Sequence, residues 1–381
     1  MNQKEVAGHD DRSALPLKPA EWWHTKNGRV VCDLCPRHCA LKAGDYGFCF
    51  VRQNVGGQLV LNTYGRSTGF CIDPVEKKPL NHFFPGSSVL SFGTAGCNLG
   101  CKFCQAWQIT KSKQVLDRLS QQATPEMIAE AAVQLGCQSV AFTYNDPVIW
   151  AEYAIDTANA CHERGLKTIA VTAGYICPEP RKEFFDVMDA ANVDLKGFTE
   201  DFYQHFTLSH LDPVLDTLRW IKKESSVWLE LTNLIIPDAN DDPLEIRQMC
   251  EWIYKELGGD VPLHFSAFHP DYRMANTPPT PPQTLVEARD IAIESGLHYV
   301  YLGNVADPPR ESTCCPQCCE ILIERRWYDL GSYQLDRNRC RFCGHTVAGH
   351  FAERPGHWGT RRVPVDPAML LRSLEAEHGA R

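Results

Sequence analysis

The 381-residue sequence predicts an α/β protein, a partial (β/α) barrel of the TIM type with a cysteine-rich module on each side. From Val89 to about Asn304, short β-branched apolar runs alternate with longer helical patterns, which is typical of parallel strands joined by helices. Most of the 18 cysteines gather in tight groups, one inside this region and one on either side of it. A large chain with such grouping favours metal sites over disulfides.

These patterns divide the chain into parts. We expect an N-terminal cysteine-rich module over residues 1–88, a barrel core over 89–305, a zinc-ribbon module over 306–350 and a polar tail over 351–381. The expected strands of the core are Val89–Phe92, Ser139–Tyr144, Thr168–Thr172, Val193–Lys196, Val227–Ile236, Leu263–Phe268 and Tyr299–Leu302.

Two helices of the core have clear boundaries. Thr124 followed by Pro125 is a typical helix start, and the pattern from Pro147 to Arg164 is amphipathic and stops at Gly165. Parallel strands joined by right-handed crossovers gather their carboxyl ends at one rim, where ligands bind.

The loop after the first core strand carries Cys97, Cys101 and Cys104 in a C-x3-C-x2-C spacing. A four-iron cluster needs four ligands, so three thiolates leave one iron open to a non-protein ligand. A zinc site fits poorly, because no fourth cysteine or histidine follows at a short spacing. The loop therefore predicts a [4Fe-4S] cluster at the functional rim.

The C-terminal cysteines form two C-x2-C pairs about twenty residues apart, each beside a proline or glycine, which predicts a zinc site. Its ligands are Cys315, Cys318, Cys340 and Cys343. Cys314 and Cys319 crowd the first pair but lack the two-residue gap.

The N-terminal group consists of Cys32, Cys35, Cys39 and Cys49. Four thiolates suit zinc and an auxiliary iron–sulfur cluster equally, so the residue types leave the metal open. A loop without metal is the third alternative.

Polar residues lie at or near several expected strand ends. They are Asn145 and Asp146, Thr172, Asp194 and Lys196, and His264 with His269. Pairs such as Asp194 and Lys196 are often merely solvated. Their common position at the carboxyl ends of strands, beside the cysteine loop, favours a shared binding site.

Charge and hydropathy exclude other classes. The formal net charge of −9 disfavours nucleic acid as a partner. No apolar stretch is long enough to cross a bilayer, and the first residues lack the apolar core of a signal peptide, so we expect a cytoplasmic protein and no membrane partner.

The cysteine loop, with Phe103 before its last cysteine, resembles the signature of the radical S-adenosylmethionine (SAM) superfamily. The resemblance implies that the open iron binds SAM and that reductive cleavage yields a 5'-deoxyadenosyl radical. It also implies that the strand-end residues contact the cofactor. These are Phe103, Asn145, Asp146, Thr172, Asp194, Lys196 and His269.

Further phrases resemble the AmmeMemoRadiSam system radical SAM enzyme, a branch similar to pyruvate formate-lyase activating enzymes. They include the N-terminal cysteines, Asp73 to Gly86, Cys104 to Trp107, Thr143 to Asn145 and Asp194 to Gly197. The resemblance implies an oxidoreductase with a flavodoxin- or ferredoxin-type electron donor and a protein substrate, Memo-like or Ammecr-like. A small-molecule or RNA substrate, and a non-enzymatic metal scaffold, are the alternatives.

Overall fold

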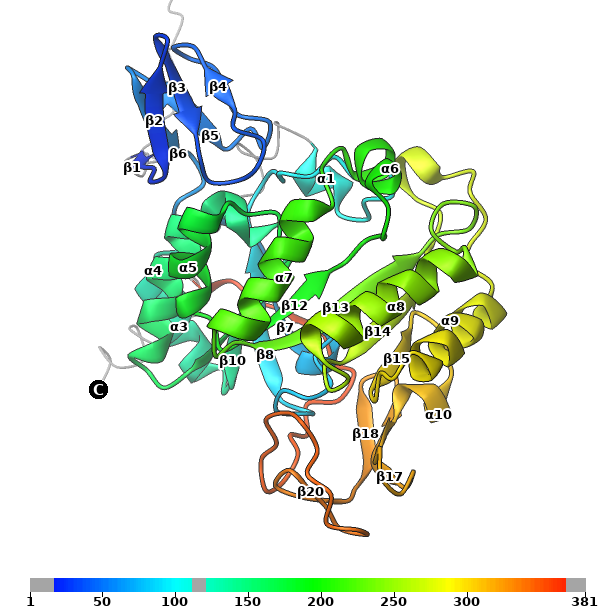
Figure 1. The fold of residues 1–381 in the computed structure, drawn as a ribbon. Coiled ribbons are helices and arrows are strands. Elements are labelled where there is room, and N and C mark those ends of the chain that lie inside the picture. Colours follow the sequence, from blue (N-terminus) through cyan, green and yellow to red (C-terminus); the bar gives the residue numbers. More distant parts are fainter. Residues whose placement is uncertain (1–16, 112–120, 368–381) are drawn as a thin grey trace, which may run out of the picture.

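The computed structural model describes residues 17–111 and 121–367. Its centre is a ten-stranded sheet in the order β15-β14-β13-β12-β11-β10-β8-β7-β21, with β9 also paired to β7 (Figure 1). Seven of these strands are parallel: β8 (Ser88–Gly93), β10 (Ser139–Phe142), β11 (Lys167–Thr172), β12 (Ala190–Asp194), β13 (Trp228–Ile235), β14 (Leu263–Ala267) and β15 (Val300–Gly303). The predicted succession of parallel β/α units is confirmed.

Helices connect the parallel strands and cover the sheet. They are α1 (Trp107–Thr110), α3 (Pro125–Gln134), α4 (Ala151–His162), α5 (Pro178–Asp186), α6 (Glu200–Phe202), α7 (Asp212–Glu224), α8 (Pro243–Leu257), α9 (Pro282–Glu294) and α10 (Pro308–Glu311). Short irregular turns lie at η1 (Val75–Lys77), η2 (Pro147–Trp150), η3 (Tyr203–Thr207) and η4 (Tyr272–Met274).

The helix starts follow from their capping residues. Thr124 accepts a hydrogen bond from the backbone N–H of Met127 at 3.3 Å, and Pro125 occupies the first helical position of α3. Before α4, the side chain of Asp146 accepts from the N–H of Val148 at 3.1 Å and starts the turn η2.

Strand β12 lies earlier in the chain than expected. The sequence predicted Val193–Lys196, but the strand begins at Ala190 and ends at Asp194. Ala190 and Ala191 are fully buried on opposite faces of β12, which pairs with β11 and β13, because both faces of a parallel sheet are covered. Lys196 therefore lies beyond the strand end, at the rim.

The sheet continues past its parallel part. Strand β7 (Arg66–Pro74) runs antiparallel to β8, and it pairs in turn with β9 (Gln121–Gln122) and β21 (Val363–Pro364). In the described part of the chain the pairing ends at β15 on one side and β21 on the other. Strand β7, within the expected N-terminal module, thus pairs with the core sheet, and residues 363–364 of the expected tail add a strand to it.

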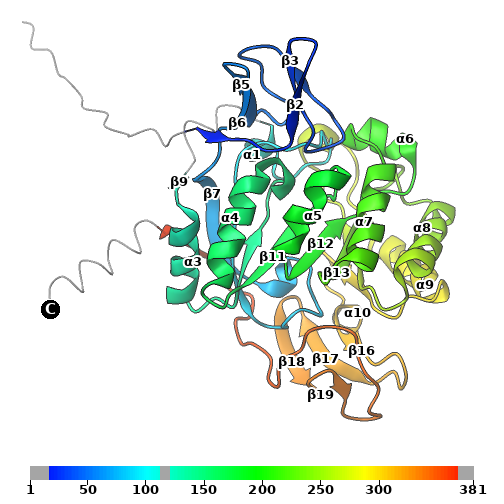
Figure 2. The same cartoon turned by 60° about the vertical axis from the view of Figure 1, so that its left-hand side comes forward.

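The N-terminal module consists of two small antiparallel sheets that end at Leu61. One contains β1 (Lys18–Pro19), β6 (Gln58–Leu61) and β5 (Arg52–Val55); the other contains β2 (Trp23–Lys26), β3 (Arg29–Cys32) and β4 (Ala40–Leu41). The C-terminal ribbon contains β16 (Thr313–Cys314), β17 (Ile321–Arg326), β18 (Asp329–Tyr333), β19 (Leu335–Asp336) and β20 (Arg339–Cys340). The two modules lie at opposite ends of the core (Figures 1 and 2).

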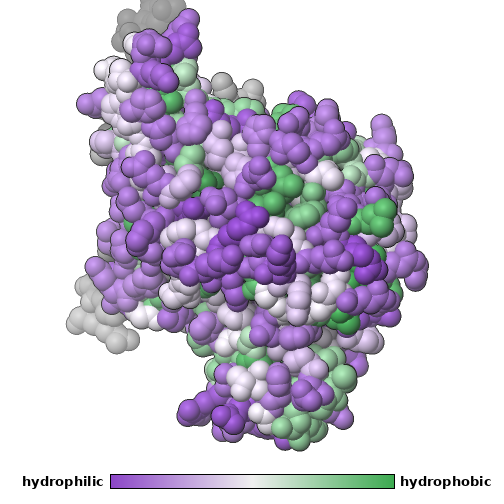
Figure 3. All heavy atoms as spheres, in the orientation of Figure 1, coloured by the Kyte–Doolittle hydropathy of each residue, from purple (hydrophilic) through white to green (hydrophobic). Residues whose placement is uncertain are grey.

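The surface is mostly hydrophilic on the face seen in Figure 3, where apolar side chains gather only in small groups. The described residues contain no helix that is both long enough and apolar enough to cross a membrane.

Candidate functional site

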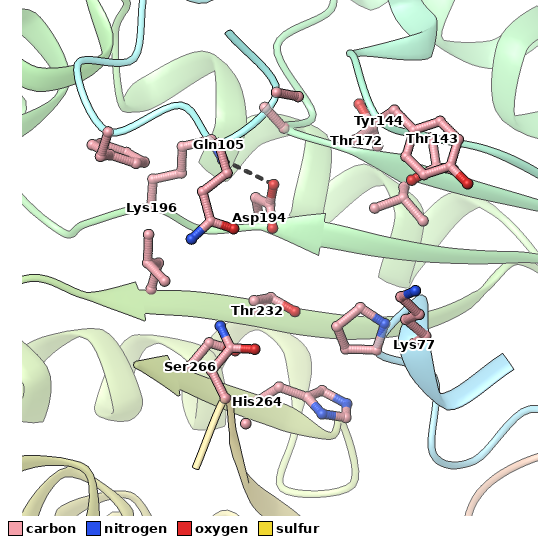
Figure 4. Close-up of a pocket in the computed structure, with 18 of the residues that line it drawn as sticks. Lys77, Gln105, Thr143, Tyr144, Thr172, Asp194, Lys196, Thr232, His264 and Ser266 are labelled. Atoms are coloured by element: carbon pink, nitrogen blue, oxygen red, sulfur yellow. Dashed lines mark hydrogen bonds and ion pairs between the residues drawn. The ribbon is translucent and has the colours of Figure 1, made fainter. Parts of the chain in front are cut away.

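A cavity of about 570 Å³ lies at the carboxyl ends of the parallel strands (Figure 4). Its volume falls within the roughly 300–1,000 Å³ that is usual for cofactor and ligand sites. Cys97, Cys101 and Cys104 line it, together with polar side chains that follow β10, end β11 and β12, and lie within β13 and β14. The structure thus brings the cysteine loop and most of the predicted rim residues into one site.

Asn145 holds the start of the cysteine loop. Its Nδ2 donates to the carbonyl oxygens of Ala95 at 3.2 Å and Gly96 at 2.9 Å, and its Oδ1 accepts from the N–H of Thr94 at 3.0 Å. A Cβ on Gly93 would lie closer than 3.0 Å to this same Oδ1, so only glycine lets the loop approach. Asn145 lines the cavity, but its side chain is occupied by the loop.

The cysteines of the loop lie in a buried setting with cations nearby. Burial raises the pKa of Cys101 to about 12, and the ammonium of Lys196 opposes that rise. Burial also raises the pKa of Cys97, against the opposing charge of Lys111. Thiols in such a setting become thiolates when a metal supplies positive charge.

Asp146 and Thr172 join the ends of two neighbouring strands. Asp146 Oδ1 accepts from Thr172 Oγ1 at 2.9 Å, and its Oδ2 accepts from the N–H of Ala173 at 3.0 Å. Burial raises the pKa of Asp146, although these hydrogen bonds favour its charged form. Both side chains line the cavity and fix the shape of its wall.

Lys196 brings a partly buried positive charge to the cavity. Its Nζ lies 2.8 Å from Asp194 Oδ2, the ion pair drawn as a dashed line in Figure 4, and 5.8 Å from the ring centre of Phe103. Burial alone would lower the pKa of Lys196, but Asp194 and Cys101 raise it above its ordinary value. The ammonium stays charged and can bind a carboxylate.

The two predicted histidines separate in the structure. His264 lies within β14 and lines the cavity, as does Ser266 two residues further on. His269 lies beyond the end of β14, is exposed, and is not among the residues that line the cavity. His264 rather than His269 therefore reaches the site, because β14 carries His264 along the cavity and the strand ends before His269.

The end of the cavity formed by Glu76 and Arg325 was not predicted from the sequence. Both are buried, and Glu76 Oε2 and Arg325 Nε have no hydrogen-bond partner within the described residues. Burial raises the pKa of Glu76 to about 7, against the opposing charge of Arg325. Trp327 and Tyr328 from the ribbon also line this end. In the sequence, the segment around Glu76 contributed to the family resemblance, but no function was predicted for Glu76 itself.

The C-terminal cysteines form a compact group. The Sγ atoms of Cys315 and Cys343 lie 3.6 Å apart, and those of Cys318 and Cys340 lie 3.7 Å apart. Within residues 17–111 and 121–367, this is the one group of three or more candidate ligands whose atoms all lie within 4.8 Å of one another. The group can hold a single metal ion, and Cys314 and Cys319 stand outside it.

The N-terminal cysteines surround a second, smaller cavity. Cys32, Cys35, Cys39 and Cys49 all line it, with Arg52 and Asn98 among its other walls.

A comparison with protein families matches residues 92–250 to the radical SAM superfamily. The chain therefore carries a radical SAM superfamily domain. The matched region contains the cysteine loop and the strand-end residues Asn145, Asp146, Thr172, Asp194 and Lys196, whereas His264 and His269 lie beyond it.

Among curated proteins, the chain is 41% identical over 324 residues to "Uncharacterized protein MJ0808" of Methanocaldococcus jannaschii, covering 84% of this chain and 96% of that protein. It is 23% identical over 117 residues to the (2S)-3-sulfopropanediol dehydratase activating enzyme of Klebsiella oxytoca, covering 30% of this chain and 36% of that enzyme.

Solved structures give weaker matches. A domain of pyruvate-formate lyase-activating enzyme from Bacteroides vulgatus has a TM-score of 0.39 and 17% identity, covering 44% of this chain and 99% of that domain. SuiB of Streptococcus suis has a TM-score of 0.45 and 11% identity, covering 61% of this chain and 52% of SuiB.

A radical SAM domain implies a [4Fe-4S] cluster and SAM, and the residues of the cavity fit both. Cys97, Cys101 and Cys104 supply three thiolates, and Lys196 supplies a charged donor for a carboxylate. When bound, the cluster supplies the electron that cleaves SAM to the 5'-deoxyadenosyl radical.

Proposed function

We propose that this protein is an AmmeMemoRadiSam system radical SAM enzyme that cleaves SAM reductively and removes hydrogen from a C–H bond of a protein substrate. The observation that carries the proposal is the joint position of Cys97, Cys101, Cys104 and Lys196 in one cavity. It makes an activating-enzyme-like oxidoreductase a better candidate than a metal scaffold, which needs no organic binding site beside its metal.

Each polar group at this end of the cavity has a separate task. Lys196 binds the carboxylate of SAM, and Asp194 holds the ammonium in place at 2.8 Å. Asp146 and Thr172 support the wall, and Asn145 fixes the start of the cysteine loop. The burial of this wall keeps water and stray hydrogen donors from the reactive carbon.

A protein substrate is favoured by where the cavity opens. Three of its lining residues are exposed: Gln105 beside the cysteine loop, Asn304 after β15, and Trp327 in the ribbon, which is 47% exposed. We infer that solvent reaches the cavity beside these residues and that a loop of a folded partner can enter there. We propose a Memo-like or Ammecr-like protein as that partner and a flavodoxin or ferredoxin as the electron donor.

The central test is SAM cleavage. The full chain, loaded anaerobically with iron and sulfide and reduced with dithionite, should release 5'-deoxyadenosine from SAM. Cys97→Ala, Cys101→Ala and Cys104→Ala should each abolish the release, because two thiolates do not hold the cluster. Cys137→Ala is the matched control, since Cys137 is buried but lies outside all three cysteine groups. Release by any of the three variants at the wild-type rate contradicts the proposal.

The substrate is tested separately. We expect mass spectrometry to find a modified residue in a Memo-like or Ammecr-like protein after incubation with the reduced enzyme and SAM, and none with Cys101→Ala. Release of 5'-deoxyadenosine without modification of either protein would point to a small molecule or RNA instead.

A further inference from the structure

The cavity of the N-terminal module is built from all four cysteines of the quartet, namely Cys32, Cys35, Cys39 and Cys49. They reach it from separate places: Cys32 ends β3, Cys35 lies in the following turn, Cys39 precedes β4, and Cys49 precedes β5. Three of the four are buried, and all are free thiols. Cysteines that converge from separate segments on one closed site are arranged as ligands.

The spacing of these thiols differs from that of a zinc site. Zinc bonds to sulfur at about 2.3 Å in a tetrahedron, which places the sulfur atoms about 3.8 Å apart. The ribbon shows this spacing, with Sγ pairs at 3.6 and 3.7 Å. In the quartet, every choice of three thiols contains a pair more than 4.8 Å apart, although all four residues lie in the described part of the chain.

The space between the thiols supports the same reading. The quartet's cavity measures about 20 Å³. That exceeds the roughly 10–15 Å³ needed by one water molecule. A sphere of that size does not fit at the centre of a zinc tetrahedron, because each sulfur lies only about 2.3 Å away. The four thiols therefore surround a small cavity and not the centre of a single-ion tetrahedron.

Cys97, Cys101 and Cys104 also lie in the described part of the chain. Their three sulfur atoms likewise do not all lie within 4.8 Å of one another. Ligands of a cluster bond to different irons, so they stand farther apart than ligands of one ion. The N–H of Phe48 donates to Cys39 Sγ at 3.4 Å, and hydrogen bonds to sulfur are a usual feature of such clusters.

The two wide sites adjoin each other. A Cβ on Gly96 would lie closer than 3.0 Å to the carbonyl oxygen of Cys49, so the two loops touch. This contact places the Cα atoms of Cys49 and Cys97 within roughly 11 Å. Asn98 of the cysteine loop forms part of the quartet's cavity wall, and Arg37 donates to its carbonyl oxygen.

We propose that Cys32, Cys35, Cys39 and Cys49 hold an auxiliary iron–sulfur cluster, ligated by cysteine alone, beside the cluster that serves SAM. The proposal concerns metal content and needs no SAM cleavage, so its outcome is separate from that of the proposed function.

The test removes the ligands of the SAM-binding cluster and measures the iron that the protein still binds. In the full-length triple variant Cys97→Ala/Cys101→Ala/Cys104→Ala, loaded anaerobically with iron and sulfide, we expect bound iron, acid-labile sulfide and a broad visible band. Adding Cys35→Ala and Cys39→Ala should remove all three signals, whereas adding Cys137→Ala should leave them. A colourless triple variant with two zinc ions per chain, or with zinc in the ribbon alone, overturns the proposal.

A second measurement covers the case in which the triple variant fails to fold. The wild-type chain should bind more iron than one [4Fe-4S] cluster contains, and Cys35→Ala/Cys39→Ala should lower that content to one cluster. After reduction, paramagnetic resonance of the wild type should show two adjacent clusters broadening each other, and the double variant should show a single sharper signal. Equal iron and identical spectra in the two proteins overturn the proposal.

Discussion

The N-terminal and C-terminal modules each contain four grouped cysteines. They differ in the spacing of the sulfur atoms and in the part of the core that each one contacts. The ribbon gathers its four Sγ atoms within 4.8 Å, whereas the N-terminal quartet spreads its thiols around a cavity of about 20 Å³. The quartet borders the loop of Cys97, and the ribbon sends Arg325 to the other end of the large cavity. Four cysteines thus occur in two arrangements, and the wider one underlies our proposal that the quartet holds a cluster rather than a single ion.

The largest effect is expected in the ribbon. Replacing Cys315 or Cys343 by Ala should release one zinc ion and unfold the ribbon, because structural zinc contributes about 10–16 kcal/mol of binding free energy to folding. Metal analysis and proteolysis measure the effect, and iron at the cysteine loop should remain. Cys314→Ala and Cys319→Ala are matched controls, since both neighbour the first pair but stand outside the group. Loss of zinc in these controls would break the comparison.

The contact between the quartet and the cysteine loop gives the next effect. Gly96 has a φ of +86°, and a side chain there would collide with Cys49. Gly96→Ala should lower the free energy of unfolding by about 2–5 kcal/mol from backbone strain and overpacking. Iron content should fall while zinc is retained.

Gly136→Ala is its control, because Gly136 also has a positive φ, +66°, but nothing lies within 4 Å of the added Cβ. Denaturant unfolding compares the two variants. Equal losses in both would show that the loops do not depend on their contact.

At the ribbon's end of the cavity, Glu76 makes stability depend on pH. Its pKa is raised from 4.5 to about 7 by burial, so between these values the folded state binds a proton that the unfolded state has lost. The contribution of Glu76 to the free energy of unfolding is therefore greatest below pH 4.5. It falls by about 3 kcal/mol as the pH rises to about 7. Denaturant unfolding of the wild type should show this fall in the free energy of unfolding between pH 4.5 and 7, and Glu76→Gln should lack it. Parallel pH profiles would contradict it.

The smallest effect concerns the other end of the cavity. Lys196→Met should weaken SAM binding by about 1.5–3 kcal/mol, because a charge-assisted hydrogen bond is lost while most of the stem remains. Calorimetry on the iron-loaded protein measures the change, and iron content checks that the cluster persists. Lys182→Met is the matched control, since Lys182 also pairs with an aspartate but lies exposed on α5. Unchanged affinity in Lys196→Met would return the Lys196–Asp194 pair to a purely structural role.

Features that depend on neighbours along the chain could be predicted from the amino-acid sequence alone. The spacing of Cys97, Cys101 and Cys104, the capping residue Thr124 and the alternation of apolar runs predicted the loop, the helix start and the parallel strands. The rim position of Lys196 followed from the same pattern. These are local signals, because the residues concerned are only a few positions apart.

Tertiary structure decided what depends on distant segments meeting. The approach of Arg325 to Glu76, the contact of Cys49 with Gly96, and the addition of β7 and β21 to the sheet join parts of the chain that no short pattern relates. The register of β14 directed His264, and not His269, to the cavity. The distance between thiols likewise follows from how β3, β4 and β5 pack, and the count of cysteines alone leaves that distance open.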